Sequence, residues 1–242
     1  MIDSVFDCHV HIESGLDSYD LTQTVKRNII FNEVSSYKTW SNKVPLGDSI
    51  SLILSVLPEE TEFVIQKAKN QEIQAFKILT RQQKLTLKDH ALLKDILQLS
   101  PPLPVIYDAF QYGDELEFQP SLEGLIFLAK SFPERKFIVA HAGGIEMLKY
   151  FFHLRTLPNI FYDLSFSIQY LHDSSVFKDL VKLIRFTPKH KLMFGSDFNY
   201  ASPHAQYSIL LSIFEEVGCS ESEQRMILHD NAALIFFHHE SI

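Results

Sequence analysis

Short apolar runs alternate along this chain with amphipathic segments. Several of the runs, among them SLILSVL, KFIVA and KLMF, contain almost no polar residue, which is typical of parallel strands covered on both faces. The pattern predicts strands at residues 4–11, 28–34, 50–57, 73–79, 104–110, 136–141, 159–165 and 191–197. NIIFNEVSSY also fits a helix that continues from Asp20, so the second strand has an alternative interpretation.

Segments with helical spacing of apolar residues separate the predicted strands. They span residues 60–70, 88–99, 121–132, 145–154, 174–186 and 204–217, and two more, 221–229 and 232–238, follow the last strand. This alternation predicts an α/β fold, a (β/α)8 TIM-like barrel that forms a single domain over residues 1–242 with extra C-terminal helices. A doubly wound open sheet is the alternative.

Composition narrows the class of protein. With 242 residues, 46% of them hydrophobic, the chain has enough apolar material for one substantial core. The net charge is -8 and the 22 Lys and Arg residues are scattered, so we expect no nucleic-acid partner. Cys8 and Cys219 suggest reduced, buried thiols. Because neither a signal peptide nor a membrane-spanning run is found, we expect a soluble, cytoplasmic protein that does not enter a membrane.

Potential ligands stand at the ends of four predicted strands. In parallel barrels such ends gather at one open mouth, so these side chains are expected to converge. The four sequences are FDCHVH, VIYD, VAH and FGSD, which end in His11, Asp108, His141 and Asp197.

His9 and His11 are separated by one residue on the first predicted strand. Since residues i and i+2 share a face of a strand, both imidazoles are expected to point into the barrel and meet one cation. Asp7 has the same parity and is expected to hydrogen-bond a ligating histidine. Cys8 has the opposite parity and is expected to pack against the helices.

Asp197 and His141 are the other two central candidates. A carboxylate after an apolar strand is unfavourable to bury unless it is paired or bound to a metal, so Asp197 is interpreted as a ligand that also takes a proton from the attacking water. A capping role in the following loop is the alternative. His141 precedes Gly143 and Gly144, which suit close backbone approach to a ligand, an ordinary turn being the alternative.

The motifs DCHVHI, FKIL, VAHAGG, NIFYDLS, FGSDF and DNAALIFF, in this order, resemble the amidohydrolase-2 branch of the metal-dependent amidohydrolase superfamily. The resemblance implies a distorted barrel in which His9, His11 and Asp197 bind one divalent cation, usually zinc. It also implies that His141 is a catalytic histidine near the metal.

One departure from that family concerns Asp108, which stands where relatives carry a histidine ligand. A carboxylate can replace imidazole, so Asp108 is expected to complete the ligand set, and the added oxygen favours Mn or Mg over Zn. A site without metal, as in some lactonases of the superfamily, stays open. Lys77 ends the strand on which two-metal relatives carry a carbamylated lysine; substrate contact or an ion pair is favoured here. Tyr107 is also expected to contact substrate.

Three hypotheses for function follow. The first is hydrolysis of an amide, ester or lactone of a small molecule. The second is metal-dependent decarboxylation of a small unsaturated acid, which needs a cation at the mouth; Lys77 is available, but no arginine can be placed there from the sequence. The third is a barrel that binds a ligand without turnover. Asp163 and Ser165 are expected to line or support the site, with specificity in the loops 35–48 and 111–120, and homo-oligomerisation stays open.

Overall fold

The computed structural model describes residues 4–12 and 15–237, and within them eight strands form one sheet in the order β1 to β8. Every strand pairs in parallel with the next one. Their bounds are β1 Val5–Val10, β2 Thr24–Phe31, β3 Ser49–Ile53, β4 Ala75–Ile78, β5 Val105–Tyr107, β6 Phe137–Val139, β7 Ile160–Asp163 and β8 Leu192–Met193. The consecutive order confirms the predicted barrel and excludes a doubly wound sheet.

Backbone hydrogen bonds between β1 and the segment after β8 bring the two ends of the sheet together. Cys8 donates to the carbonyl of Phe194 at 3.0 Å, and Asp197 donates to the carbonyl of His9 at 2.8 Å. A parallel bridge joins Val10 to Phe198. The first and last strands are therefore neighbours, as the predicted convergence of His9 and Asp197 requires.

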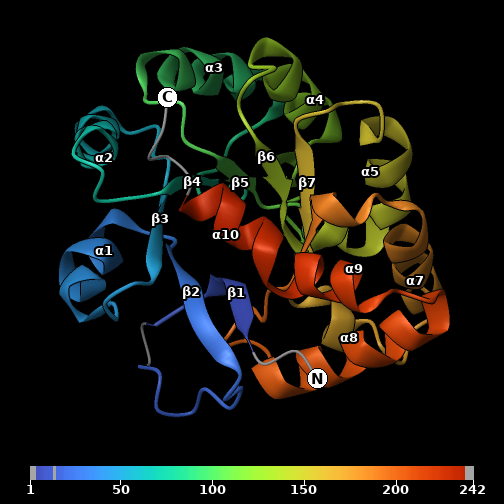
Figure 1. Cartoon of the computed structure of the whole chain (residues 1–242). Helices are drawn as coiled ribbons and strands as arrows, with labels where there is room; N and C mark the ends of the chain where they lie inside the picture. The colour runs from blue at the N-terminus through green and yellow to red at the C-terminus, as the bar shows by residue number, and fades with distance from the viewer. Residues whose placement is uncertain (1–3, 13–14, 238–242) are drawn as a thin grey trace.

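Helices surround the barrel in Figure 1. Several begin with ordinary capping chemistry: the Ser121 hydroxyl accepts from the Gly124 amide, and Pro58 stands in the first turn of another helix. The bounds are α1 Val34–Trp40, α2 Pro58–Lys69, α3 His90–Leu99, α4 Leu122–Ser131, α5 Met147–Leu154, α6 Ser167–Tyr170, α7 Phe177–Phe186, α8 Pro203–Val217, α9 Glu221–Arg225 and α10 Asn231–Phe236. The predicted helices are present within a few residues, but α1 and α6 were not predicted, and residue 238 lies outside the described residues.

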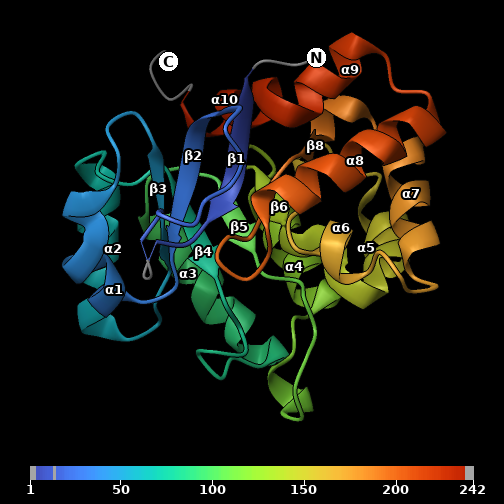
Figure 2. The ribbon, with the colours of Figure 1, turned by 90° about the horizontal axis from the view of Figure 1, so that it is seen from below.

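The helix α10 closes one end of the barrel. Its apolar side chains, those of Ala232, Ile235 and Phe236, belong to the same buried cluster as interior residues such as Phe6 and Ile106. Figure 1 shows α10 crossing the barrel, and Figure 2 places it at the end where the strands begin. The opposite end, where the strands finish, is thus the open one. Among the described residues, no helix combines the length and the apolar character needed to cross a bilayer.

The second strand begins earlier than the apolar pattern suggests. It spans Thr24–Phe31 instead of 28–34, and Val34 already opens α1, so the alternative helix from Asp20 is wrong. The first half of this strand is polar because Arg27 is only partly buried and is held by Asp48, with its backbone and side chain each donating at 2.9 Å. Local hydrophobicity therefore did not reveal this half of the strand.

Candidate active site at the barrel mouth

A bulge in β1 sets the directions of the residues around His9. Asp7 pairs with Arg27 and Val10 with Ile29, so three steps along β1 match two along β2. This extra residue interrupts the alternation of side chains. Cys8 accordingly joins the buried cluster at the barrel floor instead of the outer helical layer, which corrects the expectation from parity. Burial and the neighbouring carboxylate of Asp163 raise the pKa of its thiol.

Asp7 supports the backbone of the site and does not touch an imidazole. Its carboxylate accepts hydrogen bonds from the amides of His9 and Ser196, at 3.2 and 2.8 Å, and from the Tyr19 hydroxyl at 2.7 Å. Burial raises the pKa of Asp7 to about 6, although these hydrogen bonds oppose the shift. The predicted hydrogen bond from Asp7 to a histidine ring is therefore not formed, and Asp163 bonds the ring of His9 instead.

His9 on β1 and His11, the residue after the end of that strand, each have an acceptor at Nδ1. The Nδ1 atom of His9 lies 2.6 Å from Oδ2 of Asp163 at the end of β7, and Nδ1 of His11 lies 3.0 Å from the carbonyl of Ile30 on β2. These contacts favour the tautomer in which Nδ1 carries the proton and Nε2 keeps a free electron pair. Burial, together with the charge of Lys77, lowers the pKa of His9 to about 4, which keeps this imidazole neutral.

The Nε2 atoms of both histidines lie close to the carboxylate of Asp197. Oδ1 of Asp197 lies 3.4 Å from Nε2 of His9 and 3.4 Å from Nε2 of His11, and the three atoms all lie within 4.8 Å of one another. Three potential ligand atoms, two imidazole nitrogens and one carboxylate oxygen, thus face one point. Two imidazole nitrogens and one carboxylate oxygen are a donor set that fits a divalent cation such as zinc.

Asp197 is held in an uncommon backbone conformation. Its φ is 60°, in the left-handed region that residues other than glycine seldom adopt. Burial would raise the pKa of its carboxyl, but His9, His11 and His141 hold it well below its usual range. The side chain is therefore ionised at the mouth.

Gly195, two residues earlier, allows this part of the chain to approach the first strand. A Cβ atom at Gly195 would lie 2.6 Å from Oδ1 of Asp163, 2.9 Å from Cβ of Ser165 and 3.1 Å from Cβ of His9. Any larger residue would displace the hydrogen bond between His9 and Asp163.

Lys77 and Asp108 form a buried ion pair beside these residues. Nζ of Lys77 lies 3.3 Å from Oδ2 of Asp108 and 3.4 Å from Nε2 of His9, and the lysine side chain is 1% exposed. Burial alone would raise the pKa of Asp108, but Lys77 and His141 hold it far below its usual range. The structure therefore brings Asp108 to the mouth as the partner of Lys77, apart from the group formed by His9, His11 and Asp197.

His141 contacts the same carboxylate oxygen of Asp108 as Lys77 does. Its Nε2 is 3.6 Å from Oδ2 of Asp108, its Nδ1 is 3.1 Å from the Ser165 hydroxyl, and its ring centroid is 4.9 Å from that of His9. Burial favours the neutral ring, but Asp108 and Asp197 raise the pKa of His141 above its ordinary value. It is thus poised to carry a proton into the mouth.

The turn after His141 depends on its glycines for packing. Gly143 and Gly144 have φ values of 92° and 59°, and a Cβ at either position would lie 3.0 Å from an aromatic atom of Tyr150 or Phe110. These glycines therefore serve close approach within the protein.

A cavity of about 720 Å³ opens above these groups, and its lining includes the predicted residues His9, His11, Lys77, Asp108, His141 and Asp197. Asp163 and Ser165 support the site from behind the lining, and Tyr107 is not part of it. Its outer wall is aromatic. The ring centroids of Phe110 and Phe166 lie 5.0 Å apart, and Phe166 stacks on Tyr170 with ring centroids 4.7 Å apart. Of the two predicted specificity loops, 111–120 contributes Tyr112 and Glu115 to the lining, whereas residues 35–40 of the loop 35–48 belong to α1 and the loop contributes nothing to this lining.

Arg81 is a residue of this cavity that the sequence did not reveal. Its Nη1 donates to the carbonyl of Phe110 at 3.2 Å, and its guanidinium carbon lies 3.3 Å from the ring centroid of Tyr112. Arg81 follows β4 by three residues, so its place after a strand was the available signal.

Tyr107 lies outside the mouth. It is fully buried, and its hydroxyl is 3.0 Å from Nε2 of His90 and 3.1 Å from the carbonyl of Ser121. Adjacent residues of a strand point to opposite faces, so when Asp108 enters the mouth Tyr107 must point toward the helices. This corrects the expected substrate contact.

The fold and the residues at its mouth define an enzyme of the α/β-barrel class. A protein-family model described as Amidohydrolase matches residues 57–237, and the chain belongs to this family. The match begins after His9 and His11, so the assignment of these two residues to the site rests on the geometry described above. No curated protein matches the chain.

Solved structures with the same fold cover almost the whole chain. An amidohydrolase from Burkholderia multivorans with bound zinc is 13% identical, with a TM-score of 0.66 and coverage of 96% of this chain and 98% of that one. A 2,6-dihydroxybenzoate decarboxylase from Rhizobium is 12% identical, with a TM-score of 0.64 and coverage of 97% and 98%. A probable 2-pyrone-4,6-dicarboxylic acid hydrolase from Acinetobacter baumannii, solved with citric acid, is 15% identical, with a TM-score of 0.59 and coverage of 96% and 98%.

Proposed function

We propose that this chain is a metal-dependent hydrolase that cleaves an amide, ester or lactone bond of a small molecule. His9, His11 and Asp197 would hold one divalent cation. The observation that carries this proposal is the convergence of two Nε2 atoms and one carboxylate oxygen, with an acceptor already in place at each Nδ1 atom.

Zinc is the preferred ion in this proposal. Two imidazoles and a single carboxylate suit zinc better than manganese or magnesium, which favour oxygen-rich sites. The pairing of Asp108 with Lys77 supports this choice, because it leaves the nitrogen-rich set of ligands as the one available. The similar amidohydrolase from Burkholderia multivorans contains zinc.

The residues divide the chemistry among them. A bound cation supplies Lewis acidity and lowers the pKa of water. Asp197, ionised at the mouth, accepts the proton of the attacking water. His141, whose pKa is raised, donates a hydrogen bond to the oxyanion that develops on the carbonyl. Asp163 holds the ring of His9 in register.

Metal analysis and activity together test the proposal. Purified protein is expected to bind about one equivalent of zinc, and to hydrolyse at least one member of a panel of esters, lactones and amides. His9→Ala and Asp197→Asn should each abolish turnover and retain the parent's circular dichroism spectrum. His204→Ala is the matched control, because His204 is an exposed histidine on α8. Near-normal hydrolysis by either site variant would refute the assignment.

The effect of zinc on the free energy of unfolding gives an independent test on the same protein. Because a ligand that binds only the folded state stabilises it, zinc at about 100 times its Kd should add about 2.7 kcal/mol to the free energy of unfolding. His11→Ala should remove this gain. An equal gain in His11→Ala and in the parent would place the metal elsewhere.

A second candidate function is decarboxylation of a small unsaturated or aromatic acid. The observation in its favour is Arg81 at the mouth, next to the aromatic wall of Phe110, Phe166 and Tyr170. This guanidinium offers a substrate carboxylate one cation, since Lys77 is already paired with Asp108, and the rings offer a planar body a stacking surface. The arginine that the decarboxylase hypothesis lacked is therefore present.

Release of carbon dioxide separates the two reactions. A panel of hydroxybenzoates and unsaturated diacids should show carbon dioxide formation if the second candidate holds, and Arg81→Gln should then raise KM about tenfold or more, because it removes a charge-assisted contact. Ester or lactone hydrolysis without carbon dioxide release supports the first candidate.

A further inference from the structure

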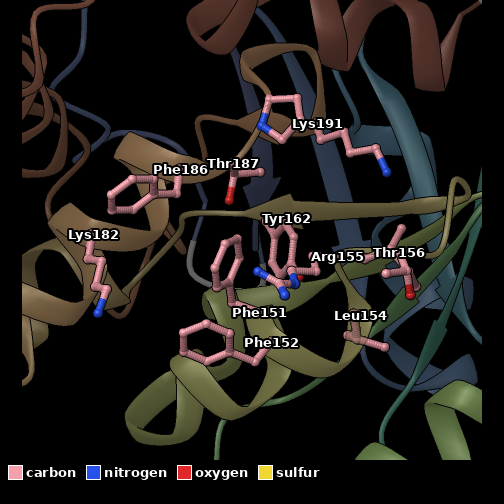
Figure 3. A pocket seen from close by; sticks show the side chains of 12 residues that line it. Phe151, Phe152, Leu154, Arg155, Thr156, Tyr162, Lys182, Phe186, Thr187 and Lys191 are labelled. Carbon is pink, nitrogen blue, oxygen red and sulfur yellow. The ribbon is translucent and has the colours of Figure 1, made fainter.

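A second cavity lies on the outer face of the barrel, between α5, α7 and β7. Its volume is about 680 Å³, within the range of small-molecule sites, and within the described residues it shares no lining residue with the mouth cavity. We call it the α5–α7 pocket. Figure 3 shows its side chains, with Phe151 and Phe152 from α5, Phe186 from α7 and Tyr162 from β7 arranged around it.

Two hydroxyl groups in the lining have no partner. Tyr162 and Thr187 are 2% and 3% exposed, and neither Oη of Tyr162 nor Oγ1 of Thr187 has a hydrogen-bond partner among the described residues. More than nine in ten buried polar groups are paired in folded proteins, so two orphans in one pocket point to a missing ligand. Figure 3 shows the Thr187 hydroxyl directed among the aromatic rings.

The rim of the pocket is positively charged. The guanidinium carbon of Arg155 and Nζ of Lys182 lie 5.6 and 6.0 Å from the ring centroid of Phe152. Neither cation has a carboxylate partner within residues 4–12 and 15–237, and the lining contains no Asp or Glu in that part of the chain. Lys191, a third cation of the lining, donates to the carbonyl of Leu157 at 3.0 Å. The pocket therefore attracts anions.

The pocket also presents exposed aromatic surface. Phe152 and Phe186 are 49% and 61% exposed, although both are large apolar side chains. Aromatic faces of this kind stack on planar ligands, and covering them removes apolar surface from water. A long aliphatic chain would also cover this surface, but it would leave the two hydroxyls unpaired.

We propose that the α5–α7 pocket is a second ligand site, which binds a planar aromatic carboxylate that carries a hydroxyl or carbonyl oxygen at its far end. The carboxylate lies at the rim between Arg155 and Lys182, where a cation is accessible. The ring packs between the phenylalanines. The far oxygen reaches the hydroxyls of Tyr162 and Thr187, which satisfies both.

The site is independent of the proposed reaction. The pocket flanks the segments that lead into β7 and β8, since Arg155 precedes Ile160 and Thr187 precedes Leu192. In barrel enzymes this is the end opposite the chemistry. A ligand here would act on stability or on the mouth from a distance, and the site can exist whether or not the mouth hydrolyses anything.

Fluorescence titration with 6-hydroxy-2-naphthoate tests the proposal directly. The parent is expected to bind it, and the neutral analogue 6-hydroxy-2-naphthamide about tenfold more weakly. Arg155→Gln combined with Lys182→Gln should raise Kd at least tenfold, and Thr187→Val three- to tenfold, in line with the loss of charged and neutral hydrogen bonds. Lys178→Gln, an exposed lysine of the same helix outside the lining, is the matched control and should leave Kd unchanged.

Thermal unfolding separates a binding role from a structural one. Without ligand, Thr187→Val should melt no lower than the parent, because it removes an unpaired buried hydroxyl. The naphthoate should raise the melting temperature of the parent and not that of the double variant. Arg81→Gln, at the mouth, should behave like the parent in both measurements.

Four results would overturn the proposal. The first is no binding of the naphthoate up to about 1 mM, and the second is equal affinity in the parent and the Arg155/Lys182 double variant. The third is loss of binding in Arg81→Gln, which would place the ligand at the mouth. The fourth is a parent protein that elutes as a dimer while the double variant elutes as a monomer. The last result would mean that a second copy of the chain covers this face.

Discussion

The Nδ1 atom of His9 lies 2.6 Å from Oδ2 of Asp163, although 154 residues separate them in the chain. This contact joins the first strand of the barrel to the seventh. It fixes which nitrogen of His9 carries the proton, and so turns the free Nε2 toward His11 and Asp197. The ligand geometry at the mouth therefore depends on a residue that does not itself face the proposed cation.

Replacing Asp163 should weaken metal binding without removing a ligand. We expect Asp163→Asn to raise the Kd for zinc about 10- to 100-fold, because partners that orient a ligating histidine typically contribute this much. Competition titration against a chromogenic chelator measures the change. Asp173→Asn, at an exposed aspartate, is the control. If both variants bind zinc like the parent, Asp163 has no orienting role.

The buried pair of Lys77 and Asp108 should be more costly to break on one side than to remove entirely. Lys77→Met should lower the free energy of unfolding by about 3 kcal/mol, since it leaves the carboxylate buried without its closest cation. Adding Asp108→Asn to this variant should recover at least half of the loss. Denaturant unfolding of the parent, both single variants and the double variant gives the coupling energy. Additive losses would show that the two side chains are not coupled.

Tyr107 should matter for stability and not for turnover. The Tyr107→Phe variant loses the hydroxyl that lies 3.0 Å from Nε2 of His90 and that bonds Ser121, so the free energy of unfolding should fall by about 1–3 kcal/mol. Values of kcat and KM should stay within about twofold of the parent, a free-energy change of only about 0.4 kcal/mol. A raised KM at unchanged stability would instead mean that Tyr107 contacts the substrate.

Asp7 should make the stability of the protein depend on pH. Its pKa is raised to about 6 by burial, above the value in the unfolded chain, so the folded state holds a proton that the unfolded state has released between about pH 4 and pH 6. Stability from this group is therefore present at low pH and lost as pH rises through about 6. Other buried carboxyls, Asp108 and Asp197, have lowered pKa values and act in the opposite direction.

A variant that cannot ionise isolates this contribution. Relative to the parent, Asp7→Asn should gain about 3 kcal/mol of unfolding free energy between about pH 4 and pH 7, because the parent alone pays for ionising a buried carboxyl. Urea unfolding at several pH values measures the difference. A difference that does not change with pH would show that Asp7 ionises as readily in the folded protein as in the unfolded chain.

Much of the barrel was accessible from the apolar pattern because strands that are covered on both faces have few polar residues. The segment around KFIVA illustrates this, since β6 at Phe137–Val139 falls within the predicted 136–141. The start of β2 was not accessible, because Lys26 and Arg27 occupy a position in the sheet that water still reaches. Similarly, α1 contains polar residues over most of its length.

The sequence likewise identified some residues of the site and missed others. Residues at strand ends were identifiable, because the parallel barrel sends all of those ends to one mouth, and His9, His11, His141 and Asp197 do meet there. The directions of Asp7 and Cys8 were not, because one extra residue in β1 breaks the alternation from which they were inferred. Arg81 was missed because it stands in a loop, where no periodicity applies.

By itself the sequence determined the alternation of strands and helices, and with it the barrel and the gathering of imidazoles and carboxylates at one end. Only the tertiary structure decided which partner each of these groups has: Asp163 for His9, Lys77 for Asp108, His90 for Tyr107. Periodicity is a local property of the backbone and can be read along the chain. Pairing depends on register, bulges and packing between strands that are far apart in sequence, and these are fixed only when the barrel closes.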